Sequence, residues 1–280
     1  MGFISNCRTL SSFSFQNIER PIVMGILNLT PDSFYDGGLY KNKSTILHKV
    51  GTMLQEGASI IDVGAYSSRP NAKHISFVEE QKRLIPILKS IVKEYPKAII
   101  SIDTFRSEIA KNSIHEGAHI INDISGGNMD SNMFKTIAEL NVPYILMHMQ
   151  GIPQTMQNNP NYTDVTSEIL FFFQNKLKEL EQAGVKNVVL DVGFGFGKTL
   201  EQNYQLLQKL TEFKVLDKPL LVGLSRKSML HKVLKTTPEE ALNATTIVHT
   251  IAILNGANIL RVHDVKEAVE VLSLINQYQK

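Results

Sequence analysis

Two aspartates and an asparagine stand out because each follows a short apolar run: Asp103, Asn122 and Asp191. A buried carboxylate needs hydrogen-bond donors, and a ligand edge rich in N–H groups supplies them. These three residues offer acceptors and an amide, without a cluster of histidines to hold a metal ion. Their chemistry suits a flat, nitrogen-rich heterocycle with an amino-amidine edge.

A second set of residues is cationic and consists of Arg69, Lys227, Arg261 and His263. Such side chains bind anions such as a phosphate or a carboxylate. Acceptors and cations together predict a substrate that is polar at one end and anionic at the other. An anionic substrate with few protein ligands also indicates Mg²⁺, held mainly by substrate oxygens and an amide or two.

The sequence lacks the usual nucleophiles of acyl transfer. Its single cysteine, Cys7, precedes the repeated pattern of apolar runs that begins at Ile22, and no Gly-x-Ser-x-Gly motif is present. We therefore predict a reaction without a covalent acyl-enzyme.

The candidate residues follow a repeated pattern of a short apolar run, a polar loop and a helical spacing of apolar residues. Short, continuous apolar runs are typical of parallel strands that are buried on both faces. The predicted strands are Ile22–Leu27, Ile60–Val63, Ala98–Ile102, Ile120–Ile121, Tyr144–Met147, Val188–Leu190, Leu220–Leu224 and Ile259–Val262. Helical spacing predicts helices over Phe77–Lys93, Ser107–His115, Val165–Ala183 and Pro238–Leu254.

Eight strand–helix repeats in one chain are what a (β/α)8 TIM barrel requires. We predict an α/β fold in which residues 21–280 form this single catalytic domain and residues 1–20 form a short N-terminal elaboration at the bottom of the barrel. A doubly wound open sheet is the alternative, but eight units without a domain break would be unusual for it.

Polar residues end all eight predicted strands, and in a parallel barrel these ends lie on one face. They are Asn28, Asp62, Asp103, Asn122 with Asp123, His148, Asp191, Ser225 to Lys227, and Arg261 with His263. A single polar residue at a strand end is often a turn-former or a helix cap. We interpret Asp123 and Asp264 in that way, whereas the convergence of eight ends predicts one site.

The segment from Gly193 to Thr199 has the letters GFGFGKT and is one residue short of a phosphate-binding P-loop. It also follows the sixth predicted strand, not the first strand of a nucleotide-binding domain. We interpret it as a glycine-rich loop that places Phe196 and the backbone near the pocket.

Composition excludes several classes of function. The 29 basic and 27 acidic residues leave a net charge of +2, which gives no electrostatic basis for binding nucleic acid or an acidic membrane. One cysteine excludes an internal disulfide framework. No apolar run reaches the ~18 residues of a membrane span, and the first twenty residues lack the apolar stretch of a signal peptide. We expect a cytoplasmic protein.

Eight segments resemble, in order, the signatures of the dihydropteroate synthase family of pterin-binding enzymes. They are Met24–Phe34, Asp62–Pro70, Ser101–Thr104, Ile121–Ile124, Met147–Gln150, Gly193–Lys198, Ser225–Ser228 and Arg261–Val265. The resemblance runs from about Pro21 to the C-terminus. The first two segments and Ser225–Ser228 narrow it from the wider pterin-binding group to the synthases.

The resemblance implies condensation of 6-hydroxymethyl-7,8-dihydropterin diphosphate with 4-aminobenzoate, which gives dihydropteroate and pyrophosphate in folate synthesis. It also implies a sulfonamide target and a homodimer. Diphosphate leaves readily once its charge is neutralised, and the pterin ring delocalises positive charge. The expected order is therefore departure of the diphosphate and then attack by the amine.

The resemblance assigns a role to each matching position. Asp103, Asn122, Met147, Asp191, Lys227 and Arg261 are expected to bind the pterin, with Arg261 stacked across its ring. Asn28, Arg261 and His263 are expected at the diphosphate, with Asn28 also on Mg²⁺. Phe34, Ser68, Arg69, Pro70, Phe196, Lys227 and Ser228 are expected around 4-aminobenzoate. The catalytic residues are expected to be Asp103, which would stabilise the cation, Lys227 and Asn28.

Two alternatives use the same heterocycle pocket. One is a methyltransferase module that binds methyltetrahydrofolate, but Arg69, Lys227 and Ser228 and the lack of an attached cobalamin domain argue against it. The other is a non-catalytic pterin-binding protein, which retention of the full set of residues disfavours. The long segments Thr30–Asn42 and Gly64–Ser76 are expected to close over the diphosphate and complete the aminobenzoate pocket.

Overall fold

The computed structural model describes residues 15, 18, 20–29, 39–66 and 74–280. In these residues eight parallel strands close into a barrel, in sequence order. The strands are β1 (Ile22–Asn28), β2 (Ile60–Gly64), β3 (Ile100–Asp103), β4 (Ile120–Asp123), β5 (Tyr144–Met147), β6 (Val188–Asp191), β7 (Leu220–Val222) and β8 (Ile259–Val262). Because β1 also pairs with β8, the predicted (β/α)8 barrel is confirmed and an open sheet is excluded.

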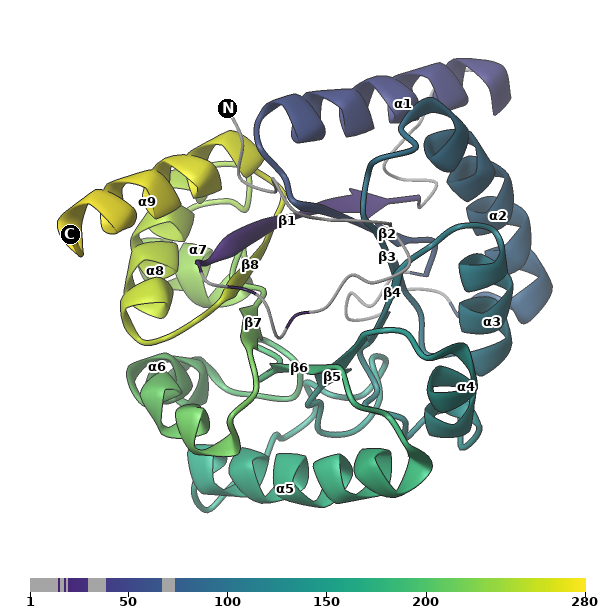
Figure 1. Ribbon diagram of the computed structural model, residues 1–280. Helices are drawn as coiled ribbons and strands as arrows, with labels where there is room; N and C mark the ends of the chain where they lie inside the picture. The colour runs from purple at the N-terminus through teal and green to yellow at the C-terminus, as the bar shows by residue number, and fades with distance from the viewer. Residues whose placement is uncertain (1–14, 16–17, 19, 30–38, 67–73) are drawn as a thin grey trace.

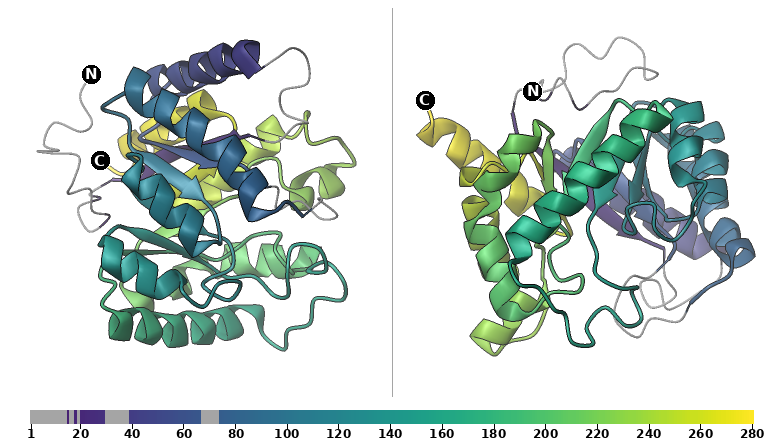
Figure 2. Two further views of the ribbon diagram at one scale, coloured as in Figure 1. Left: turned by 90° about the vertical axis from the view of Figure 1, so that its right-hand side faces the viewer. Right: turned by 90° about the horizontal axis from the view of Figure 1, so that it is seen from below.

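Helices surround the barrel on its outside, as Figure 1 and the two turned views of Figure 2 show. They are α1 (Leu39–Gln55), α2 (Phe77–Glu94), α3 (Ser107–His115), α4 (Met133–Leu140), α5 (Val165–Ala183), α6 (Leu200–Gln208), α7 (Ser228–Leu234), α8 (Leu242–Leu254) and α9 (Val265–Tyr278). A 3₁₀ helix spans Leu210–Leu216. The bounds of α3 and α5 are those predicted from the sequence.

Side-chain hydrogen bonds fix where several helices begin. The Asp164 carboxylate accepts from the Ser167 N–H at 2.8 Å at the start of α5. Thr199 and Gln202 form a capping box at the start of α6. These caps set the point at which the chain turns from the mouth of the barrel into the outer layer.

The interior of the barrel is divided into an apolar bottom and a polar layer above it. The bottom cluster consists of Phe15, Met24, Ile60, Ile99, Ile120, Ile145, Val189, Leu221 and Ile259. Side chains alternate along a strand, so the next inward position is two residues further on. That position is polar in five strands, where it is Asp62, Ser101, Asn122, Asp191 or Arg261.

Several predicted boundaries differ from the observed ones: β3 begins at Ile100, not at Ala98, and β7 ends at Val222, not at Leu224. Two differences at helix starts have identifiable reasons. Helix α8 begins at Leu242, not at Pro238, and the carbonyls of Pro238 and Glu239 instead accept from Arg226 at 2.9 and 2.6 Å. Helix α1 begins at Leu39, so the end of the predicted loop Thr30–Asn42 is helical. At α8 the contacts with Arg226 override the local sequence pattern, and at α1 the helix continues into the end of the predicted loop.

The N-terminal elaboration is described at Phe15, Ile18 and Arg20 alone. The Phe15 side chain is buried in the bottom cluster, and its N–H donates to the Asn187 side chain at 3.3 Å. The remainder of the predicted elaboration lies outside the described residues. Among the described helices, none combines the length and the hydropathy that a membrane-spanning segment needs.

Candidate active site

The register of the first four strands places four residues side by side at the mouth of the barrel: Asn28, Gly64, Asp103 and Asn122. We call them the inward row. A Cβ atom on Gly64 would lie 3.1 Å from the Cβ of Asp103, so the glycine leaves room beside that carboxylate. Two of the predicted heterocycle acceptors, Asp103 and Asn122, are thus neighbours on adjacent strands.

Arg261 reaches from β8 to the inward row. Its Nη2 donates to Asp103 Oδ2 at 2.7 Å, and its Nε donates to Asp62 Oδ2 at 2.6 Å. The same Asp62 oxygen accepts from Asn122 Nδ2 at 3.0 Å. Asp62 has no exposed surface, so it ties Arg261 and Asn122 together from below.

From the sequence alone, Asp62 is expected at a strand end and has no assigned role. The structure puts it inside β2 and in contact with two predicted site residues. The signal that identifies it is its spacing of two from Ile60, which points both side chains into the barrel.

Burial, together with the charge of the Asp62 carboxylate and against the effect of Arg261, raises the pKa of Asp103 to about 7. Burial by itself would lower the pKa of Arg261, but Asp62 and Asp103 raise it above the ordinary value. The guanidinium therefore stays charged between two carboxylates. Asp103 changes its ionisation near neutral pH, where perturbed groups of an active site commonly titrate.

Asp191 ends β6 beside Met147 of β5 and is 5% exposed. Burial raises the pKa of Asp191, and a hydrogen bond from the Gly193 N–H, 2.8 Å long, opposes that shift. The third predicted acceptor and the predicted pocket methionine therefore lie next to each other on the same face of the barrel.

Lys227 supplies a cation at the start of α7. Its Nζ lies 4.2 Å from the centroid of the Phe196 ring. Burial, and then the charge of Arg261, lower the pKa of Lys227 to about 8, while Asp191 and Asp103 act in the opposite direction. Acceptors and cations are thus close enough to influence one another, as one shared site requires.

The remaining described candidates lie around this centre. His263 follows β8, and its Nδ1 lies 3.1 Å from Ser225 Oγ. Burial, and then the charge of Arg261, lower the pKa of His263 to about 4, so this imidazole is neutral and is not one of the cations expected from the sequence. Asn28 is half-buried at the end of β1, and Ser228 is exposed at the start of α7. A third apolar cluster lies at the carboxyl ends of the strands β2 to β5 and in the loops that follow them, and it consists of Tyr66, Phe105, Ile124, Met147, Met149 and Met156, with Phe196 packed against it.

Lys198, the lysine of the P-loop-like segment, points into its own loop. It is 3% exposed, and its Nζ donates to the carbonyls of Gly193 and Phe196 at 2.8 and 3.0 Å. It does not present its ammonium to a phosphate, so the nucleotide-binding interpretation is excluded and the glycine-rich loop is confirmed.

The chain matches the family described as pterin-binding enzymes over residues 24–263. It is 44% identical to a dihydropteroate synthase of Escherichia coli over 92% of each chain. The Yersinia pestis dihydropteroate synthase, solved with a sulfonamide drug complex, matches with a TM-score of 0.88 and 41% identity, over 94% of this chain and 96% of that one.

The chain belongs to the dihydropteroate synthases. It is therefore a transferase of folate biosynthesis. The dihydropteroate synthase of Xanthomonas albilineans, solved in complex with 7,8-dihydropteroate, is also similar, with a TM-score of 0.84 and 33% identity over 94% of this chain and 95% of that one. Such relatives favour the synthase over the methyltransferase alternative.

Four candidates for the aminobenzoate pocket of this synthase lie outside the described residues: Phe34, Ser68, Arg69 and Pro70. The two segments expected to close over the diphosphate fall largely there as well. These expectations remain predictions.

Asp123 and Asp264 each come directly after a predicted site residue, Asn122 or His263, and both have a structural role. The Asp123 carboxylate accepts four hydrogen bonds of 2.7–2.9 Å, from Ser125 N, Ser125 Oγ, Gly127 N and Tyr144 OH. Asp264 pairs with Arg226 through two contacts of 2.9 Å. Both were predicted to be loop-formers, and this is confirmed.

Residues His115–His119 read His-Glu-Gly-Ala-His, a spacing that can bind zinc when it lies on one helix. The expectation from the sequence that no such zinc motif is present missed this match and is wrong as a statement about the sequence. Helix α3 ends at His115, Gly117 has φ +96°, and His119 Nδ1 accepts from the Ile100 N–H at 3.1 Å. The described residues hold no group of three or more His, Cys, Asp or Glu side chains suited to a metal.

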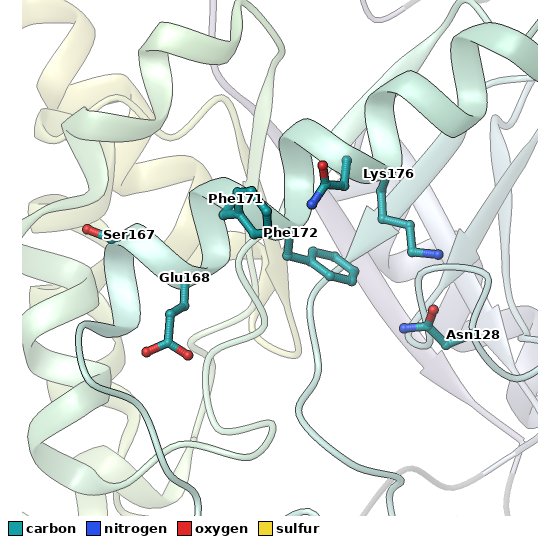
Figure 3. A pocket seen from close by; sticks show the side chains of 7 residues that line it. Asn128, Ser167, Glu168, Phe171, Phe172 and Lys176 are labelled. Atoms are coloured by element: carbon teal, nitrogen blue, oxygen red, sulfur yellow. The ribbon is translucent and has the colours of Figure 1, made fainter.

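A separate hollow of about 580 Å³ lies along α5 and is drawn in Figure 3. Its walls are Asn128, Ser167, Glu168, Phe171, Phe172, Asn175 and Lys176. None of the predicted site residues lines it, so it is not part of the active site.

Proposed function

We propose that the mouth of this barrel condenses 6-hydroxymethyl-7,8-dihydropterin diphosphate with 4-aminobenzoate, and that the described residues divide the work as follows. The single observation that carries the assignment is the linked set of Asp62, Asp103, Asn122 and Arg261 beside Asp191 and Lys227. It combines buried acceptors with cations on one face of the barrel.

The pterin is proposed to bind Asp103, Asn122, Met147, Asp191, Lys227 and Arg261. Two buried acceptors, Asp62 Oδ1 and Asn122 Oδ1, have no hydrogen-bond donor among the described residues. An acceptor left in this way is costly. The N–H groups of a pterin edge are donors of the kind that this layer lacks, which supports the assignment.

The diphosphate is proposed to bind Asn28, Arg261 and His263. Mg²⁺ fits this arrangement because Asn28 offers an amide oxygen and the anionic substrate offers the other ligands. The described residues lack a carboxylate and histidine cluster that would hold the ion without substrate. When bound, the ion would neutralise charge on the leaving diphosphate.

4-Aminobenzoate is proposed to lie between Phe196, Lys227 and Ser228, together with Phe34, Ser68, Arg69 and Pro70. The ammonium of Lys227 beside the Phe196 ring supports this placement, because it offers a cation to a carboxylate and an apolar face to an aromatic ring.

The proposed reaction breaks the bond from the exocyclic methylene carbon to the diphosphate oxygen, which keeps the electron pair. Asp103 stabilises the positive charge left on the pterin. The amine nitrogen then forms the new bond to carbon and releases a proton. Lys227 and Asn28 hold the reacting groups in place, and no protein nucleophile is used.

The experiment that tests this proposal measures pyrophosphate release. It should require both substrates together and should fail when Mg²⁺ is chelated. Release of pyrophosphate from the pterin diphosphate alone, at the same rate, would contradict the proposed condensation. A non-catalytic pterin-binding protein, the remaining alternative, would release none.

We also propose that the protein is a homodimer formed through α8 and α9. Exposed apolar side chains gather there, namely Ile247, Ile251 and Leu254 on α8 and Leu274 and Tyr278 on α9. A groove of about 430 Å³ lies between the two helices. A patch of this kind on a surface is typical of an interface. Light scattering on wild-type protein and on Ile251→Glu tests the proposal, since only the wild type should have twice the mass of one chain.

The cytoplasmic location predicted from the sequence is part of the same proposal. The single cysteine supports it, because a chain without a disulfide framework suits a reducing compartment.

A further inference from the structure

Lys198 is enclosed by the loop that leads from β6 to α6. Its Nζ donates to the carbonyl oxygens of Gly193 and Phe196 and lies 3.2 Å from Nδ1 of His148. An ammonium has three donors, and these three partners use all of them. In the neutral amine, two N–H groups serve the carbonyls and the lone pair faces a protonated Nδ1. In either form no N–H remains for a substrate.

His148 anchors this arrangement to β5. Burial, and then the charge of Lys198, hold the pKa of His148 well below its usual value, so the imidazole is neutral. The ring is packed edge-on against Phe172 of α5, with centroids 4.9 Å apart. The lysine therefore joins the loop to the residue that follows β5, which is itself packed against α5.

The loop backbone is shaped to turn its carbonyls toward the lysine. Gly193 and Gly197 have φ of +68° and +64°. A side chain on Gly193 would collide with the carbonyl oxygen of His148, and a Cβ on Gly197 would lie 2.6 Å from the carbonyl oxygen of Gln150. Glycine is required at both positions, by conformation and by space.

Two groups of the active site depend on this loop. The Gly193 N–H donates to Asp191 Oδ1 at 2.8 Å, and the Phe196 ring lies against Lys227. The two carbonyls that Lys198 holds belong to the same two loop residues, Gly193 and Phe196. A change at Lys198 is thereby transmitted to the site through the backbone.

We propose that Lys198 is a positioning residue for the aminobenzoate side of the active site, which it shapes by fixing Phe196 from behind without touching a substrate. This inference rests on the proposed placement of 4-aminobenzoate against Phe196. It gives the P-loop-like segment a function that is neither phosphate binding nor simple loop closure.

The test is steady-state kinetics of Lys198→Met, which keeps an unbranched apolar side chain and removes the charge and donors. We expect the KM for 4-aminobenzoate to rise about tenfold, with a smaller change in the KM for the pterin diphosphate, because misplacing one wall of a pocket weakens that substrate most. A purely structural role would instead lower the active fraction and leave both KM values unchanged. The matched control is Lys209→Met, which replaces a partly exposed lysine at the end of α6, the helix that follows this loop. Both of its KM values should equal those of the wild type.

Phe196→Ala and the double variant separate this inference from the function on which it rests. If Lys198 acts through Phe196, the double variant has the same KM for 4-aminobenzoate as Phe196→Ala alone. Fully multiplicative effects, or an unchanged KM in Lys198→Met, would overturn the inference. An unchanged KM in Phe196→Ala would instead refute the placement of 4-aminobenzoate.

If Lys198→Met does not fold, a variant at Gln157 tests whether this loop shapes the 4-aminobenzoate pocket. The exposed Gln157 donates from Nε2 to the Gly195 carbonyl of the same loop at 2.6 Å. Gln157→Ala should raise the KM for 4-aminobenzoate in the same direction by roughly two- to fivefold, as expected for loss of one hydrogen bond. An unchanged KM there would count against control of the pocket by this loop.

Discussion

Asp103 and Asp123 end neighbouring strands, β3 and β4, and burial raises the pKa of both. Their hydrogen bonds differ. Asp123 faces outward and accepts four bonds from its own turn and from Tyr144. Asp103 faces inward, and among the described residues Arg261 is the side chain that pairs with it. A satisfied carboxylate shapes the fold, whereas one with acceptor capacity to spare at the mouth can take a ligand.

The largest effect should come from replacing the inward carboxylate. Asp103→Asn is expected to lower kcat/KM by ~10²–10³, as for loss of one preorganised electrostatic group. Steady-state pyrophosphate release measures it. Wild-type turnover in this variant would remove Asp103 from the mechanism.

The same variant should not be less stable than the wild type at pH 8. Folding raises the pKa of Asp103 from 3.8 to about 7, so the folded state binds its proton more tightly. The contribution of this group to stability is therefore lost as the pH rises from 3.8 to about 7, and asparagine removes that loss. Thermal unfolding at pH 8 tests the sign.

An intermediate effect is expected at Asp62. Asp62→Asn removes the charge that orients Arg261 but keeps an acceptor for Asn122, so kcat/KM should fall by ~10- to 100-fold, as for loss of a charged hydrogen bond. Most of the fall should appear in the KM for the pterin diphosphate. A change confined to the KM for 4-aminobenzoate would show that Arg261 acts elsewhere.

The pH dependence of kcat/KM should show a smaller effect, which distinguishes the charge of Asp103 from that of Lys227. The kcat/KM of the wild type is expected to rise as Asp103 ionises near pH 7 and to fall as Lys227 loses its proton near pH 8. Asp103→Asn should lose the rising limb, and Lys227→Gln should lose the falling limb. Retention of both limbs in both variants would assign them to other groups.

The smallest effect on activity is expected for the outward carboxylate. Asp123→Asn turns an NH₂ group toward donors, so we expect a loss of about 1–3 kcal/mol in the free energy of unfolding. The kcat/KM per folded molecule should stay within about threefold of wild type. Tyr144→Phe removes one of the same donors and should lower the free energy of unfolding by less. Denaturant titration and turnover together would expose any catalytic role of Asp123.

Much of the barrel follows from the sequence because its strands are continuous apolar runs. Tyr144–Met147 and Ile259–Val262 were predicted with their observed bounds. The predicted strand Ile120–Ile121 was too short, because Asn122 and Asp123 are polar but still pair with β5. The role of a polar residue within a strand can be predicted only when it is known whether its side chain points into the barrel or out of it.

The candidate site was predicted in outline, and its interior connections were not. Strand ends indicated Asp103, Asn122 and Asp191. Asp62, in contrast, acts through Arg261, which is 199 residues away in the chain. Lys198 acts through the carbonyls of its own loop and through His148. Such contacts depend on barrel closure and on backbone direction, which local patterns do not contain. His148 shows the reverse error, since it follows a strand but packs against Phe172 of α5 and contacts Lys198.

The most direct test of the account compares pterin binding by the two aspartate variants. Isothermal titration with 6-hydroxymethylpterin, which carries no diphosphate, would be run on wild type, Asp103→Asn and Asp123→Asn. We predict that affinity falls at least about tenfold in Asp103→Asn and is unchanged in Asp123→Asn. Equal losses in both variants, or an unchanged affinity in Asp103→Asn, would contradict the claim that the inward residues hold the heterocycle.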